Sequence, residues 1–284
     1  MNADVYEFFS RENGEEAKKD VAFAPFAFFA RLKKQADNGA GRVRLRTKTM
    51  ARAMFIDRFE FERALRGRGL ARVAGVDEAG RGLLVGPVVA AAAIFPAKWV
   101  ETGLPRELDG LNDSKQLTPR QREVFFTFLT GCAEVEFAIA EVDAGQIDEI
   151  NILRATHQAM NAALAKLNPP PQHALVDGRP VKTLRVPQTA LIQGDARSYS
   201  IAAASVLAKV TRDRRMLEFD RQWPAYGFAG HKGYGTARHL AAIAAHGPCP
   251  IHRKSFAPMK PKEPELFTTD KHGFGKTSLI LSPR

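Results

Sequence analysis

Short apolar stretches alternate with longer amphipathic ones from residue 71 onward. Strand-like runs, either continuously apolar or alternating, are expected at 72–77, 87–95, 134–142, 173–177 and 189–193. Helical spacing predicts helices at 119–131, 146–167, 200–219 and 236–247, the first of them opened by the capping pair Thr118 and Pro119. This alternation predicts an α/β fold whose mixed sheet is covered by helices.

The two ends of the chain differ from this central part. Residues 1–70 form a basic N-terminal extension of unreadable function, and its segment 55–69 is expected to be a helix that leads into the main domain. Residues 261–284 mix proline, lysine, glutamate, glycine and threonine, which is typical of a flexible tail. The domain itself is therefore placed at 71–260.

Composition excludes several classes of protein. The longest apolar stretch, 85–100, contains Pro87, Pro96 and Lys98, so it falls short of the roughly 20 residues that span a bilayer. The first residues are acidic, unlike a signal peptide, and a cytoplasmic location without a membrane partner is expected. Two cysteines offer neither a disulfide framework nor zinc-ligand spacing.

The formal net charge of +11 predicts attraction to polyanions. Its basic excess lies in the two terminal parts, while the central part is nearly neutral. A merely solvated basic surface is the alternative explanation.

Carboxylates end three of the predicted strands. Asp77, Asp177 and Asp195 each stand at or just past the C-terminal end of an apolar strand, and Glu78 lies beside the first. At this edge of an α/β sheet ligands bind, and gathered carboxylates repel one another unless a divalent cation neutralises them. Oxygen ligands favour Mg²⁺ or Mn²⁺. The alternative is that each aspartate caps a turn on its own.

Several motifs, in order and spacing, resemble one known family. They are GVDEAGRGLLVGPVVAAA (75–92), LNDSKQL (111–117), LVDG (175–178), QGDARSYSIAAASVLAKVTRDR (193–214), YGFAGHKGYGT (226–236) and HRKSFAP (252–258). Together they resemble the bacterial ribonuclease HII family, over roughly residues 71–260. The resemblance implies an RNase H-like fold with a mixed five-stranded sheet flanked by helices and a C-terminal helical part.

The resemblance also implies an activity. Such an enzyme is an endoribonuclease that hydrolyses the RNA strand of RNA/DNA hybrids and nicks 5′ of single ribonucleotides in duplex DNA. The family's four metal-binding, catalytic carboxylates map onto Asp77, Glu78, Asp177 and Asp195. Two-metal catalysis leaves 3′-hydroxyl and 5′-phosphate ends. The implied partners are Mg²⁺ or Mn²⁺ and these nucleic acids, and a monomer is expected.

Substrate-binding residues follow from the same motifs. Gly80, Arg81 and Gly82 resemble the family's GRG motif, which reads the 2′-hydroxyl at the RNA–DNA junction; glycine lets backbone groups approach a sugar. Tyr234 matches the tyrosine that stacks on the following deoxyribose. The remaining motif positions, expected to hold the nucleic-acid backbone, are Asn112, Lys115, Lys232, Arg253 and Ser255.

The chain departs from the family pattern at five positions. The family usually has proline at Leu83 and Gly235 and lysine at Gln116, and commonly lysine at Gln193 and arginine at Lys254. None of these removes a metal ligand. The lost charges at 116 and 193 predict weaker phosphate binding, and Gly235 predicts a looser loop around Tyr234.

The sequence leaves other functions as alternatives. A non-catalytic hybrid-binding protein is the main alternative, and a resolvase with the same fold is another. Asp213 is the rival fourth carboxylate, although its arginine neighbours favour a surface ion pair. GFGKTS (273–278) lacks the first glycine of a phosphate loop, and Ser205 has no nucleophile elbow.

Overall fold

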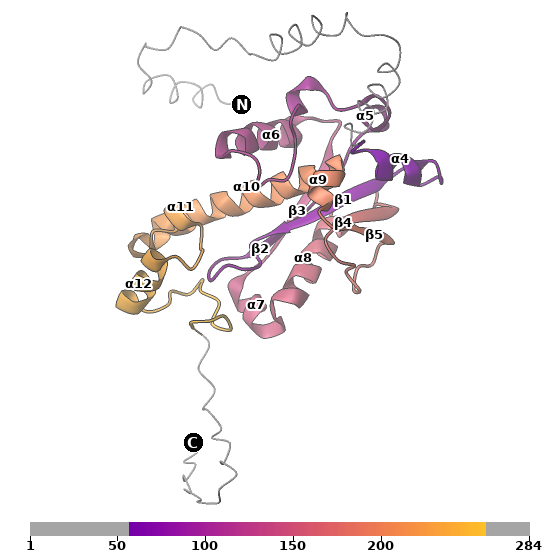
Figure 1. Ribbon diagram of the computed structural model, residues 1–284. Coiled ribbons are helices and arrows are strands. Elements are labelled where there is room, and N and C mark those ends of the chain that lie inside the picture. Colours follow the sequence, from indigo (N-terminus) through magenta and orange to yellow (C-terminus); the bar gives the residue numbers. More distant parts are fainter. Residues whose placement is uncertain (1–56, 260–284) are drawn as a thin grey trace, which may run out of the picture. The chain divides into compact units, whose positions relative to one another are not determined.

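A five-stranded mixed sheet forms the centre of the protein in the computed structural model, which describes residues 57–259 (Figure 1). Its strand order is β3-β2-β1-β4-β5. β1 pairs antiparallel with β2, and β2 with β3, whereas β1, β4 and β5 run parallel. The strands are β1 (Val73–Ala79), β2 (Val88–Ile94), β3 (Glu136–Val142), β4 (His173–Asp177) and β5 (Gln188–Leu191). The mixed sheet expected from the sequence is confirmed.

Strand β2 explains why the sheet has helices on both faces. All seven of its residues are buried, in the sequence VVAAAAI. Side chains of a strand alternate between faces, and Val89, Ala91 and Ala93 enter one hydrophobic core while Val88, Ala90, Ala92 and Ile94 enter the other. A strand that is apolar on both faces is stable only between two layers of helices.

The long helix α10 (Tyr199–Gln222) covers one face, together with α6 (Pro119–Gly131), and Figure 1 shows both on the same side of the sheet. Small side chains let α10 lie close to β1: a Cβ on Gly75 would come within 2.1 Å of the Ser200 backbone. Glycine at 75 is therefore a requirement of the packing. Helix α6 begins with the expected capping box, formed by Thr118 and Gln121.

Two helices, α7 (Ala144–Ile150) and α8 (Ile152–Ala165), cover the other face. The prediction of one continuous helix at 146–167 is wrong, because the chain breaks at Asn151. That residue has φ 69° in the left-handed region, which asparagine tolerates, and its side chain accepts hydrogen bonds from the N–H groups of Leu153 and Arg154. The break starts α8 anew.

A C-terminal helical part follows α10 and confirms that expectation. It packs around buried Tyr226, Phe228 and Cys249, together with Val85 and Met216. Its elements are η2 (Pro224–Tyr226), α11 (Phe228–His231) and α12 (Ala237–His246). Shorter elements elsewhere, which the periodicity did not predict, are α5 (Ala97–Thr102), η1 (Arg106–Leu108) and α9 (Gly194–Arg197).

Helix α4 (Glu60–Arg66) precedes the first strand, as expected. The compact unit that holds the sheet also contains α4, although this helix lies before residue 71. Residues 1–56 of the predicted N-terminal extension, the predicted tail 261–284 and GFGKTS (273–278) lie outside the described residues. Among helices of the described part, none has the length and apolarity to cross a membrane.

Candidate active site

Three carboxylates meet at one edge of the sheet. Asp77 lies on β1 and Asp177 ends β4, and because these strands are parallel with Val76 opposite Val176, the two aspartates lie side by side. Asp195 comes from α9, after β5. One oxygen from each of Asp77, Asp177 and Asp195 lies within 4.8 Å of the others. The structure thus brings together three of the four expected ligands.

Electrostatics make this cluster costly without a cation. Burial, together with the charges of Glu78 and Asp177, raises the pKa of Asp77 well above its ordinary value. Burial and the charges of Asp177 and Asp113 raise the pKa of Asp195 to about 6. A divalent cation among these oxygen donors would offset the repulsion and favour the ionised forms. The donor set and its spacing fit Mg²⁺ or Mn²⁺.

Glu78 occupies a neighbouring position. It is not one of the three carboxylates within 4.8 Å, and its Oε1 accepts a 3.2 Å hydrogen bond from Arg81. Burial raises the pKa of Glu78, while Arg81 acts in the opposite direction. Glu78 lines the same cleft as Asp77, and it is bonded to Arg81 of the GRG turn (residues 80–82).

Arg253 holds the GRG turn in place by hydrogen bonds to its backbone. The Arg253 guanidinium donates to the carbonyl oxygens of Gly80 at 2.6 Å, Arg81 at 2.8 Å and Gly86 at 3.0 Å. Arg253 has 0% exposed surface, so the expected contact of Arg253 with the nucleic-acid backbone is wrong in this structure. Its bonds instead hold the carbonyl oxygens of the turn, in which Arg81 and Gly82 are exposed. The sequence motif signalled the residue but not its role.

A second buried arginine connects the segment after the GRG turn with the loop that carries Tyr234. Arg212 on α10 donates to the carbonyl oxygens of Val85 at 3.1 Å and Lys232 at 2.8 Å. Gly80 has φ +100°, and a Cβ there would come within 2.5 Å of the Arg212 side chain. The first glycine of the motif is thus required by both conformation and space.

Tyr234 is 54% exposed and projects from a backbone held by histidines. His239 Nδ1 lies 2.9 Å from the Tyr234 carbonyl oxygen, His239 Nε2 lies 3.1 Å from His252 Nε2, and the Cys249 N–H donates to His252 Nδ1. These three contacts are all satisfied when both rings are neutral: His239 Nδ1–H donates to the carbonyl oxygen, and His252 Nε2–H donates to His239 Nε2. Burial, which lowers the pKa of His252 to about 4, keeps that ring neutral. His239 and His252 therefore hold the backbone at Tyr234, and neither belongs to the metal-binding group found among the described residues.

One cleft of about 650 Å³ extends from Asp77 and Glu78 to the GRG turn and Tyr234. Asp77, Glu78, the GRG turn, Lys115 and Tyr234 all line it. Further lining residues that the sequence did not place in this site are Ser114, Ile152, Ser205, Lys209, Arg212 and Phe256; of these only Ser205 had been considered, as a hydrolase nucleophile. Ser205 and Lys209 are four residues apart on α10, a spacing that places both on one helix face. In the sequence, this spacing was the feature that could have indicated that the two residues lie together.

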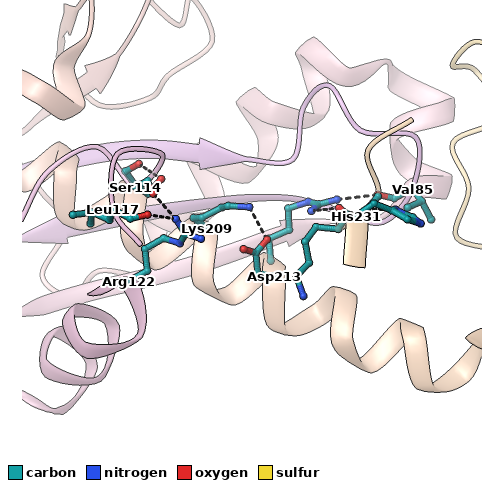
Figure 2. A network of polar contacts seen from close by, with 11 residues as sticks. Val85, Ser114, Leu117, Arg122, Lys209, Asp213 and His231 are labelled. Carbon is teal, nitrogen blue, oxygen red and sulfur yellow. Dashed lines mark hydrogen bonds and ion pairs between the residues drawn. The ribbon is translucent and has the colours of Figure 1, made fainter. Parts of the chain in front are cut away.

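Asp213, the rival fourth carboxylate, pairs with Lys209 at 2.7 Å (Figure 2). It is absent from the group of three aspartates. Asp213 forms an ion pair, as expected, but the pair is half-buried instead of on the surface, and its partner is the lysine of the cleft and not one of the neighbouring arginines.

The loop at 111–117 presents Lys115 to the carboxylates. Arg122 donates to the carbonyl oxygens of Ser114 and Leu117 and holds this loop (Figure 2). The pKa of Lys115 is raised. Partial burial lowers it, but the negative charges of Asp113 and of the three site aspartates together have the larger effect. Asn112 donates to Gln116 at 3.0 Å.

The other expected substrate contacts lie further away. Ser255 is exposed but its hydroxyl donates to Asp148 at 2.6 Å. Lys232 is half-buried, and burial lowers its pKa. Neither lines the cleft. Of the substituted family positions, Leu83 is buried, whereas Gln116, Gln193, Gly235 and Lys254 are exposed.

A mixed sheet with carboxylates clustered beside its parallel strands fits an enzyme that uses a divalent cation, and comparisons with known proteins give its class. The family model for ribonuclease HII matches residues 74–259. A ribonuclease HII of Geobacillus kaustophilus is 54% identical over 200 residues, 70% of this chain and 74% of that protein. One from Geobacillus thermodenitrificans is 48% identical over 246 residues, 87% and 88% of the two chains.

The fold is similar to that of solved relatives. The crystal structure of ribonuclease H2 from Pyrococcus horikoshii superimposes with a TM-score of 0.55 at 30% identity, covering 66% of this chain and 95% of that one. The chain belongs to the ribonuclease HII family. It is thereby a metal-dependent endoribonuclease of the ribonuclease H type.

Proposed function

We propose that this protein cleaves the RNA strand of RNA/DNA hybrids and nicks duplex DNA on the 5′ side of single embedded ribonucleotides. The observation that supports this proposal is the shared cleft: the GRG turn and Tyr234 line the same 650 Å³ space as Asp77 and Glu78. A cleft that reads a sugar hydroxyl beside its catalytic carboxylates suits cleavage at a ribonucleotide.

Each site residue has a role in this proposal. Asp77, Asp177 and Asp195, with Glu78 alongside, would hold two divalent cations, Mg²⁺ or Mn²⁺. Bound cations supply activation of the attacking water and stabilisation of the leaving 3′ oxygen. Ser205 and Lys115 border the carboxylates, and the Lys115 ammonium would hold the phosphate next to the scissile bond.

Recognition falls to the turn and the loop. The backbone of Gly80, Arg81 and Gly82, kept in place by Arg253, would approach the ribose 2′-hydroxyl. Tyr234 would stack on the sugar that follows. A DNA strand lacks this hydroxyl, so the same contacts would leave it uncut.

The direct test is cleavage of a long RNA/DNA hybrid with Mg²⁺, Mn²⁺ or chelator, followed by analysis of the product ends. We expect metal-dependent products whose 3′ ends a DNA polymerase extends and whose 5′ ends a ligase joins without a kinase. Products with 2′,3′-cyclic phosphate would contradict the two-metal mechanism, because they arise from attack by the ribose itself. Tight hybrid binding with no cleavage would favour the binding protein.

A further inference from the structure

Helix α4 lies outside the segment that matches the family model, yet it contacts the active site. Arg58, just before the helix, donates from Nη2 to the carbonyl oxygen of Asp195 and from Nη1 to that of Leu111, both at 2.5 Å. The first carbonyl belongs to a carboxylate of the candidate metal site, and the second begins the loop that carries Lys115. One guanidinium therefore joins two separate walls of the site.

Arg58 is itself held in a fixed position. Its guanidinium lies 4.5 Å from the centre of the Tyr199 ring, and its carbonyl oxygen accepts a 3.1 Å bond from the Tyr199 N–H. The next residue, Phe59, is 2% exposed and packs against Tyr199 and Phe95. The planar fork of an arginine anchored in this way can hold two carbonyl groups at a defined separation.

Glu62 adds a second connection one turn later. It is 1% exposed, and its Oε1 accepts from the Ser198 hydroxyl at 2.6 Å and from the Ser200 N–H at 3.3 Å. Ser198 in turn caps α10 by accepting from the Ile201 N–H. Glu62 of α4 thus bonds to Ser198, in the turn between α9 and α10, and to Ser200, in the first turn of α10. Helix α9 is the one that carries Asp195.

We propose that Arg58 and Glu62 are positioning residues that set Asp195 and the 111–117 loop against Asp77 and Asp177. Helix α4 is on this account a structural part of the metal site. The inference rests on the proposed metal site, and its consequence is that a change at Arg58 weakens metal binding without touching any ligand side chain. Partners of this kind around a metal site change affinity or activity by about 10–100-fold when removed.

The same helix contains a matched control. Arg63 also donates to a backbone carbonyl, that of Val100, and pairs with Asp57. The first contact attaches α4 to α5, and the second joins α4 to the segment just before it; neither involves a site carboxylate or the 111–117 loop. If α4 mattered only as a packed helix, the substitutions Arg58→Ala and Arg63→Ala would have the same effect on the metal site.

The experiment measures Mn²⁺ binding by isothermal titration calorimetry for the full-length protein and for Arg58→Ala and Arg63→Ala. Hybrid cleavage against Mn²⁺ concentration gives a second readout, with kcat and KM separated at saturating metal. We expect Arg58→Ala to weaken Mn²⁺ binding by about tenfold or more and Arg63→Ala to leave it unchanged, even where both lower the unfolding temperature. Arg58→Lys should be intermediate, because one ammonium group cannot reproduce the planar fork.

Equal Mn²⁺ affinities of the Arg58→Ala and Arg63→Ala variants would overturn this inference alone. If Arg58→Ala does not fold, the comparison of Arg58→Lys with Arg63→Lys decides in the same way. Absence of Mn²⁺ binding by the unaltered protein would instead overturn the proposed metal site, and the inference with it.

Discussion

Asp177 accepts, through Oδ1, a 2.7 Å hydrogen bond from the backbone N–H of Gly194, the residue before Asp195. This bond draws α9 against the end of β4. A Cβ on Gly194 would come within 2.7 Å of the Ile201 side-chain end and within 3.1 Å of the Leu191 Cβ, so a larger residue there would require these side chains to move. The Asp177 carboxylate is therefore tied to the backbone of the segment that carries Asp195, and Asp77 completes the group from the neighbouring strand.

Substitution Asp77→Asn should reduce hybrid cleavage to the level seen with chelator while hybrid binding is kept, because it removes a metal ligand at nearly constant volume. In chelator the variant should also unfold roughly 2–4 °C higher, equivalent to about 1 kcal/mol, since a buried carboxylate is no longer held beside Glu78 and Asp177. Cleavage assays and thermal unfolding of the same preparation check both. Near-normal turnover would refute the assignment of this ligand.

The metal-free protein should lose stability as the pH rises through the slightly acidic range. In the folded protein the pKa of Asp195 is raised from 3.8 to about 6, so the folded state binds more protons than the unfolded chain between these values. The stabilisation is complete below about pH 4 and is lost as the pH rises through 6. Mn²⁺ needs the ionised form, so its stabilising effect should grow from pH 5 to pH 7. Thermal unfolding with and without Mn²⁺ measures this.

For that pH series, Asp195→Asn is the control, because it has no carboxyl to titrate. It should show a weaker pH dependence in chelator and a smaller response to Mn²⁺. A Mn²⁺ effect on the unaltered protein that is constant from pH 5 to pH 7 would contradict the account.

Substitution Arg253→Gln should lower the free energy of unfolding by about 3 kcal/mol, since it leaves buried carbonyl groups of the GRG turn without donors. Urea unfolding measures this loss. Among molecules that remain folded, cleavage at a single ribonucleotide should fall more than cleavage of a long hybrid. An equal fall on both substrates would show that the turn has no special part in reading the junction.

Substitution Tyr234→Ala should raise KM for a duplex with one ribonucleotide roughly tenfold, equivalent to about 1.4 kcal/mol, and leave stability unchanged because the ring is 54% exposed. Tyr234→Phe should behave as the unaltered protein, since stacking needs the ring alone. Steady-state kinetics on that duplex separate the two. Full activity of the alanine variant would exclude stacking by this residue.

The sheet and the carboxylates could be predicted from the sequence because both follow from local patterns. Apolar strands that end in Asp77 and Asp177 mark the edge where ligands bind, and parallel pairing then brings them together. The break at Asn151 was missed since helical periodicity continues across it. Only the backbone, φ 69° at that residue, separates α7 from α8.

The roles of buried polar residues could not be obtained from the sequence. Arg253 looks like a surface base in its motif, but long-range packing buries it under the GRG turn, 172 residues away from Arg81 along the chain. Arg58 likewise meets Asp195 across 137 residues. Such contacts depend on how distant elements pack, a feature that no local pattern contains.

The central claim is tested most directly by a labelled DNA duplex that contains one ribonucleotide, incubated with Mg²⁺, with Mn²⁺ and with chelator, and mapped to the nucleotide. The account predicts one metal-dependent nick on the 5′ side of the ribonucleotide and none in the all-DNA duplex. Cleavage of long hybrids without any nick in this duplex, or cleavage of the all-DNA duplex, would contradict it.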